Sequence, residues 1–239
     1  MPQPLSRVKP NADLSVGPLD LPGKELAKDV AAVIGCCSYL EATLGECLAH
    51  LIKSKPSLGV VIFQSLVSTT SKLAVLKGVI SHVLTGYERD ILLCLVQLAS
   101  RAISRRNEIA HGLWGSSPDI PDALVLMSTS AHLDVEVRRL TSIKRKRFDK
   151  ELFALYRSKM QIYKKQDFDN IFHDLLVAAR QIEHFWSLKR AKSLLPGAMR
   201  SWISTSPHLQ EELRRLREGR KKSASTPQQK RPPRPRAIA

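Results

Sequence analysis

The chain has little of what a β-rich fold requires. Aromatic residues make up 5% of its 239 residues and there are only 11 glycines, whereas strands favour aromatic side chains and tight turns favour glycine. Hydrophobic residues nevertheless make up 43% of the chain, which is enough to fill a core. These proportions favour a mainly α-helical protein.

The sequence also lacks segments that would place it in a membrane. No apolar run reaches the roughly 18 residues that a membrane-spanning helix needs. Residues 1–6 contain no apolar stretch resembling a secretory signal. We therefore expect a cytoplasmic protein with no membrane partner.

Motifs for metal ions, cofactors and covalent catalysis are missing as well. There is no Cys-x-x-Cys pair, no His-Glu-x-x-His sequence, no acidic metal cage and no glycine-rich phosphate loop. We therefore expect no bound metal and no cofactor. The four cysteines lie in apolar helical context, which favours buried free thiols in a reducing compartment: Cys36, Cys37, Cys47 and Cys94.

Positive charge is what the chain has in excess, with a formal net charge of +16. From Arg214 onward ten basic residues stand against Glu218 alone, so this tail carries +9 and residues 1–213 carry +7. A flexible segment with so much charge attracts polyanions without reading their sequence. The tail thus favours RNA as a partner, while a solubilising tail and a localisation signal are the alternatives. The candidate RNA contacts in it are Arg220, Lys221 and Lys222.

Hydrophobic residues recur at three- and four-residue steps over most of the chain, which is typical of amphipathic helices. Pro56 separates the first stripe from the second, and Asp167 is a candidate cap for the last long stripe. We expect helices over residues 24–53, 58–80, 89–111, 148–159, 168–186 and 207–217.

Between the third and fourth of these helices the pattern changes to that of strands. Residues 123–127 form an apolar run, and residues 133–138 alternate between apolar and charged side chains. We expect a β-hairpin over about 122–138. The fold class is thus mainly α, an up-and-down helical bundle with a small β-hairpin and disordered termini. Its parts are a flexible leader (1–23), a helical domain (24–195), a short helical segment (196–218) and a disordered basic tail (219–239).

Polar residues gather near the end of the third predicted helix, which is otherwise strongly apolar. With about 100° per residue, Ser104, Asn107 and His111 fall on one narrow stripe of this helix. Asn107 precedes His111 by one turn, so its amide can orient the imidazole ring. Arg106 instead projects into the apolar arc, where a guanidinium must be paired, reach solvent or lie at an interface with another subunit.

These residue types suit the cleavage of a phosphodiester. RNA cleavage through the 2′-hydroxyl needs a base and an acid that titrate near neutrality, which histidine provides. An arginine binds phosphate through two hydrogen bonds and stabilises the charge that grows in the transition state. One His111 cannot conveniently serve both sides of the phosphorus, whereas a symmetric dimer presents two of them across one cleft.

The run from Arg106 to Trp114 resembles a known motif. Arg106, Asn107 and His111, at the end of an apolar helix that follows two long helices, are similar to the R-x4–6-H motif of the HEPN superfamily (higher eukaryotes and prokaryotes nucleotide-binding). The run looks like the RN-x-IAHG-x-W version found in many small bacterial members. The resemblance covers residues 24 to 192. It implies a helical bundle that dimerises and, in active members, metal-independent endoribonuclease activity with these three residues in the active site.

The resemblance also implies a biological setting in prokaryotic defence or stress response, with a cognate antitoxin or a defence partner as candidates. Position 113 is Leu113, so the tyrosine of the R-x4-H-x-Y toxin subset is missing. The superfamily also contains non-catalytic RNA binders and scaffolds, which is the alternative function. A polar network that closes the end of the bundle is the alternative role for the three motif residues.

Two further arginines of this helix, Arg101 and Arg105, are candidates for holding RNA phosphates in the same cleft, together with Ser104. Solvated basic residues beside a polar stripe are the alternative. We therefore expect a homodimer that binds RNA, either as an endoribonuclease or as a non-catalytic RNA-binding or scaffold protein.

Overall fold

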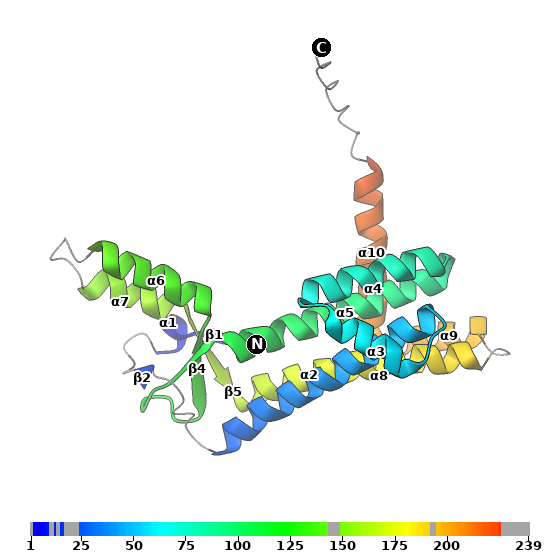
Figure 1. Ribbon diagram of the computed structural model, residues 1–239. Coiled ribbons are helices and arrows are strands. Elements are labelled where there is room, and N and C mark those ends of the chain that lie inside the picture. The colour runs from blue at the N-terminus through cyan, green and yellow to red at the C-terminus, as the bar shows by residue number, and fades with distance from the viewer. Residues whose placement is uncertain are drawn as a thin grey trace, which may run out of the picture.

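The structure is a computed structural model that describes residues 2–9, 12, 15–16, 24–142, 149–191 and 195–225. Helices dominate this part of the chain, and a small antiparallel sheet lies at one end of the helical body (Figure 1). The prediction of a mainly α fold with a small β insertion is therefore confirmed.

The helical body is an up-and-down arrangement in which successive helices reverse direction (Figure 1). Its core is formed by the apolar stripes that the sequence shows, with Leu44, Leu95 and Leu175 fully buried among them. The helices of this body are α2 (Lys24–Leu51), α3 (Pro56–Ser65), α4 (Thr69–Val83), α5 (Gly86–His111) and α8 (Lys165–Arg190).

The second predicted helix is two helices in the structure. The chain is extended at Leu66, where α3 ends, and Ser68 caps α4 by accepting a hydrogen bond from the Ser71 backbone N–H at 3.0 Å. A serine in this position satisfies one of the free N–H groups that begin a helix. The prediction of one helix over 58–80 is wrong because this local cap competes with a continuous stripe.

Glycine lets α3 lie directly on α2. A Cβ atom added at Gly59 would lie 2.4 Å from the Ala49 Cβ and 2.5 Å from the Gly45 backbone oxygen. Such distances exclude any side chain at this crossing. The close approach fixes α3 with one face against α2 and the opposite face turned outward.

One segment of α2, Leu26–Leu51, is long and apolar enough to cross a membrane by length and composition alone. The expectation that no segment reaches this size is therefore wrong for α2. In the fold, 44% of its most apolar window is buried, and α2 packs against α3 and α8. A core helix passes the same test of length and composition.

The sheet is antiparallel throughout, in the order β1-β5-β4-β3-β2. Its central strand β4 has apolar residues on both faces. Leu124 and Leu126 join the helical core, whereas Val125 joins a smaller cluster under the sheet. A strand that is covered on both sides has a continuous apolar sequence, as β4 does. The strands are β1 (Gln3–Pro4), β2 (Ser15–Val16), β3 (Leu113–Ser116), β4 (Ala123–Met127) and β5 (Met160–Lys164).

The predicted hairpin has a different second strand from the one expected. β4 pairs with β3 on one side and with β5 on the other, so both of its edges are occupied. Residues 133–138, predicted as a strand, belong to helix α6 (Thr129–Ser142). Ser128 precedes this helix, and its Oγ accepts a hydrogen bond from the Ala131 backbone N–H at 3.2 Å. Helix α7 (Asp149–Ser158) lies beside α6 and agrees with the predicted helix over 148–159.

The two ends of the chain are more ordered than the sequence predicts. In the leader, β1 and β2 are the edge strands of the sheet, α1 (Leu5–Val8) follows β1, and Leu5 is fully buried. The description of 1–23 as wholly flexible is wrong for these residues, because apolar Leu5 fills the cluster under the sheet. At the other end, α9 (Leu195–Ser204) and α10 (Pro207–Ser225) pack onto the body.

Helix α10 extends beyond the predicted end at 217. Arg220, Lys221 and Lys222 are therefore helical rather than part of a tail without structure. Leu209 and Leu213 of α10 are buried in the main core, which anchors the helix that continues into the basic segment. The rest of the predicted tail, residues 226–239, lies outside the described residues.

Candidate functional site

The candidate site lies where α5 ends and the sheet begins. Gly112 follows the helix, and its N–H donates to the Glu108 carbonyl at 3.0 Å. A Cβ atom at Gly112 would lie 2.2 Å from the Leu126 Cδ1 of β4, so only glycine fits there. The backbone φ of Gly112 is −78°, which shows that the glycine provides space rather than a left-handed turn. The predicted helix end at His111 is confirmed.

Arg106 projects toward the helical core, as its position on the helix predicts. It is half-buried, and its Nε is enclosed without a hydrogen-bond partner. It lies near Cys37 of α2: burial raises the pKa of Cys37 to about 11, and the positive charge of Arg106 partly opposes this rise. The guanidinium thus lies in the apolar arc of α5, where the described residues do not provide all of its hydrogen-bond partners.

Asn107 binds Arg106 rather than His111. The Arg106 Nη1 donates a hydrogen bond to the Asn107 Oδ1 at 3.2 Å. Among the described residues no hydrogen bond joins Asn107 to His111, so the prediction that Asn107 orients the imidazole is wrong in the single chain. The amide of Asn107 therefore fixes the guanidinium and leaves the ring without this restraint.

His111 is exposed at the last position of α5. Its backbone carbonyl accepts a hydrogen bond from the Thr129 hydroxyl at the start of α6. Ser104 is also exposed, and Asn107 is half-buried between them. We call Ser104, Asn107 and His111 the α5 polar stripe. It faces away from α8, because the buried residues of α5 form the opposite arc.

Arg101 and Arg105 lie on another side of α5. Arg105 and His111 are six residues apart, which places them roughly 120° apart around the helix. The Arg105 Nη1 forms an ion pair with the Asp174 Oδ2 of α8 at 2.6 Å, and the Arg101 Nη2 donates to the Glu212 Oε2 of α10 at 2.6 Å. The prediction that these arginines line the same cleft as His111 is therefore wrong.

The two arginines instead line a cleft of about 630 Å³ between α5 and α8, which we call the α5–α8 cleft. Its charges are mixed, since Glu108 and Asp174 lie beside the two arginines. The Tyr163 hydroxyl donates to the Glu108 Oε2 at 3.4 Å; burial, followed by this carboxylate, raises the pKa of Tyr163. Other residues that line the cleft are Asn170, His173, Val177 and His208. With its carboxylates so close, the cleft is a poor phosphate site.

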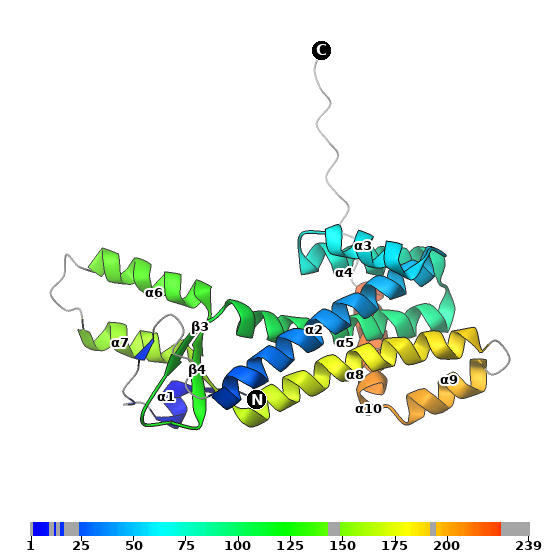
Figure 2. The same ribbon diagram turned by 60° about the horizontal axis from the view of Figure 1, so that its bottom comes forward.

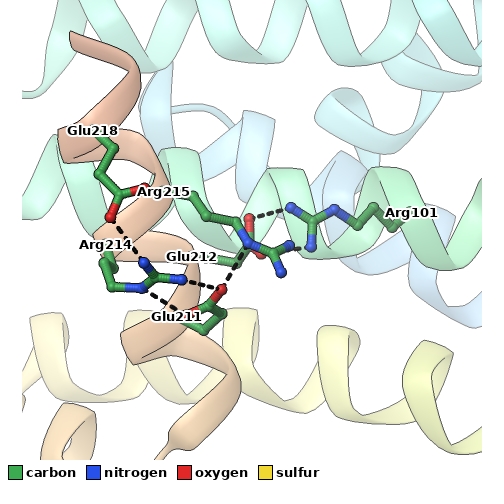
Figure 3. Close-up of polar contacts among 6 residues, drawn as sticks. All are labelled: Arg101, Glu211, Glu212, Arg214, Arg215 and Glu218. Carbon is green, nitrogen blue, oxygen red and sulfur yellow. Dashed lines mark hydrogen bonds and ion pairs between the residues drawn. The ribbon is translucent and has the colours of Figure 1, made fainter. Parts of the chain in front are cut away.

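A buried carboxylate ties α10 to α5. Glu212 is 4% exposed and binds both Arg101 and Arg215, the latter at 3.1 Å (Figure 3). A buried carboxylate needs such paired, hydrogen-bonding cations to remain charged. Figure 3 also shows Arg214 on the outer side of α10, between Glu211 and Glu218. Arg101 thus has a structural role that its sequence position does not reveal.

The ion pairs of Glu212 lead to a prediction for the stability of a Glu212 variant. Replacing Glu212 with Ala is expected to lower the free energy of unfolding by ~1–2 kcal/mol, because Arg101 and Arg215 lose a buried partner but remain half-exposed to water. Urea denaturation of the whole chain measures this change. Glu218→Ala is the matched control: it removes an exposed partner of Arg214 and is expected to change the value by less than about 0.5 kcal/mol. An equal effect of both variants would contradict the structural role of Glu212.

The four cysteine thiols are buried, and that of Cys37 lies near Arg106. Burial raises the pKa of Cys47 to about 12 and also raises that of Cys36, so both thiols are poor nucleophiles. Within the described ranges no three His, Cys, Asp or Glu side chains gather as metal ligands.

Sequence reasoning missed the residues that bind the α5 arginines. Asp174 and Glu212 are far from α5 in the chain, and no local spacing points to their pairing. Thr129, which binds the His111 carbonyl, also went unrecognised, although the serine-rich segment 128–130 signals a helix cap. In the comparisons with known proteins, the chain matches no family model, no curated protein and no solved structure.

Proposed function

We propose that the protein is a HEPN-like, metal-independent endoribonuclease that acts as a homodimer. In this proposal His111 exchanges a proton with the 2′-hydroxyl or the leaving oxygen. Arg106 stabilises the negative charge of the pentacoordinate phosphorus, and Asn107 holds the guanidinium in place. The proposal places the protein in the cytoplasm, with a role in defence or stress response and a cognate antitoxin or defence protein as a candidate partner.

The observation that carries the proposal is the contrast among the arginines of α5. Arg101 and Arg105 form ion pairs with carboxylates, whereas Arg106 forms none among the residues that the structure describes. Its single polar contact in this part of the chain is the neutral amide of Asn107, and exposed His111 follows one turn later. A cation that no carboxylate neutralises is suited to an incoming phosphate.

The chemistry supports two copies rather than one. Cleavage through the 2′-hydroxyl removes a proton on one side of the phosphorus and supplies one on the other. The α5 polar stripe contains a single histidine, and two other histidines close to α5, His173 and His208, line the α5–α8 cleft instead. A second copy related by twofold symmetry provides the second imidazole.

Cleavage of a structured RNA in the presence of EDTA tests this proposal. We expect chelator-resistant cleavage that leaves a 2′,3′-cyclic phosphate on the 5′ fragment, because the neighbouring hydroxyl is the nucleophile. Products with a 5′-phosphate and a 3′-hydroxyl, or activity that EDTA removes, would contradict it.

A non-catalytic RNA-binding or scaffold protein is the second candidate. The net charge of +16 and the missing contact between Asn107 and His111 favour it. Salt-sensitive RNA binding without cleavage at any protein concentration would support this candidate over the enzyme.

A further inference from the structure

An apolar stripe lies exposed on α3. Val61 and Ile62 follow Leu58 after three and four residues, and Val61 is 63% exposed. Val67, in the turn to α4, is fully exposed. We call these four residues the α3 stripe. Because Gly59 holds the other face of α3 against α2, this stripe cannot turn inward.

A second apolar stripe lies exposed on α6. It consists of Leu133, Val137 and Leu140, at four- and three-residue spacing, each 58–59% exposed. We call it the α6 stripe. Val135 points the other way and is buried. Large exposed aliphatic side chains grouped on one helix face mark an interaction surface.

The two stripes lie on either side of the candidate site. Figure 2 shows α3 above α2 and α6 above α7, with the C-terminal half of α5 between them. Gly59 of α3 packs on α2 and Val135 of α6 is buried, so both stripes lie on exposed faces of their helices. The α5 polar stripe belongs to this half of α5.

We propose that two copies of the chain pair reciprocally, the α6 stripe of each covering the α3 stripe of the other. This inference rests on the homodimer of the proposed function and specifies its contacts. A twofold axis that passes over the ends of both α5 helices exchanges the two sides of each molecule, so every α6 meets a partner's α3. Both His111 side chains then face one enclosed space.

Charge favours this pairing over contact between two α3 stripes. From Cys47 to Tyr87 the chain contains no carboxylate, and Lys53 and Lys55 lie exposed beside the start of α3. Two α3 stripes together would bring lysines against lysines. The α6 helix contains Asp134 and Glu136, which pair at the surface with arginines of their own helix. Such exposed pairs are weak, so these carboxylates can face the partner's lysines.

Reciprocal contact also increases the surface area that the dimer buries. One stripe of three or four aliphatic residues buries too little surface for a stable interface, for which about 1,200–2,000 Å² is typical. In the reciprocal dimer each stripe is used once by each copy, so two separate contacts add to that between the α5 ends. Each contact strengthens the other because both form in one step.

Crosslinking between two variants that each carry one added cysteine tests the arrangement. V61C and V137C chains, one of them enlarged by a tag, are mixed and treated with a short bifunctional maleimide. We expect a crosslink between the two different chains, and little product from either variant alone. The four native thiols are buried and remain unmodified in the fold. Efficient crosslinking of V137C with itself, or of V61C with itself, would overturn the reciprocal arrangement.

Sedimentation of charged variants gives a second measurement. V61D and V137D are each expected to weaken the dimer at least ~10-fold, because every substitution places an unpaired carboxylate in both contacts. V83D is the control, since Val83 is 43% exposed but lies at the other end of α4 from Val67. Dimers unaffected by V61D would overturn the inference even if cleavage persists. Crosslinked dimers without cleavage would leave the inference standing and remove the proposed enzyme.

Discussion

Replacing His111 with Ala is expected to lower the rate of RNA cleavage by ~10²–10⁴-fold, the range typical for loss of a general acid–base group. The side chain is exposed, so its removal leaves the packing of α5 intact and the free energy of unfolding nearly unchanged. Single-turnover cleavage at saturating protein measures the chemical step separately from RNA binding. RNA affinity is expected to change little, because phosphate contacts dominate it.

His173→Ala is the matched control for this measurement. His173 is also exposed and lies close to α5, but it lines the α5–α8 cleft rather than the α5 polar stripe. We expect normal cleavage from this variant. Cleavage that survives in His111→Ala, or that fails in His173→Ala, would move the site to the other side of α5.

Most of the helices were predictable because their apolar residues repeat with the helical period. The stripes of α2, α5 and α8 are buried in the structure, whereas the stripe of α3 is exposed. The errors occurred where contacts with distant parts of the chain determine the secondary structure. Residues 133–138 alternate as a strand does, but β5 occupies the edge of β4 that they would need. The helix that forms instead leaves Val137 exposed, a position that the period-two pattern assigned to a buried face. The sequence signal was weak for β5 and for the leader strands, which are short.

The sequence predicts the helix that carries the candidate site, but it does not predict the residues that pair with the arginines of this helix. Spacing alone places Arg106 in the apolar arc and His111 at the helix end, as the structure has them. The roles of Arg101 and Arg105 depend on Glu212 and Asp174, which fold back from distant parts of the chain. Periodicity identifies the face of a helix on which a residue lies, but it does not identify what covers that face.

Replacing Arg106 with Met is expected to separate function from stability. The guanidinium occupies apolar territory, and leaving its buried Nε without a partner costs about 1–3 kcal/mol. Met keeps an unbranched apolar side chain and removes this group, so the free energy of unfolding is expected to stay equal or rise. Cleavage is expected to fall ~10²–10³-fold, as when a preorganised charge stabiliser is lost.

Arg105→Met is the control, and we expect the opposite effects on stability and cleavage from it. It removes a half-exposed ion pair with Asp174, so it is expected to lower the free energy of unfolding by ~0.5–1 kcal/mol and to leave cleavage unchanged. Urea denaturation and single-turnover cleavage on both variants measure the two effects together. If Arg106→Met is the less stable variant, the arginine belongs to the packing of the bundle. If it is stable and inactive, the chain retains an unsatisfied cation for a phosphate that its own fold does not supply.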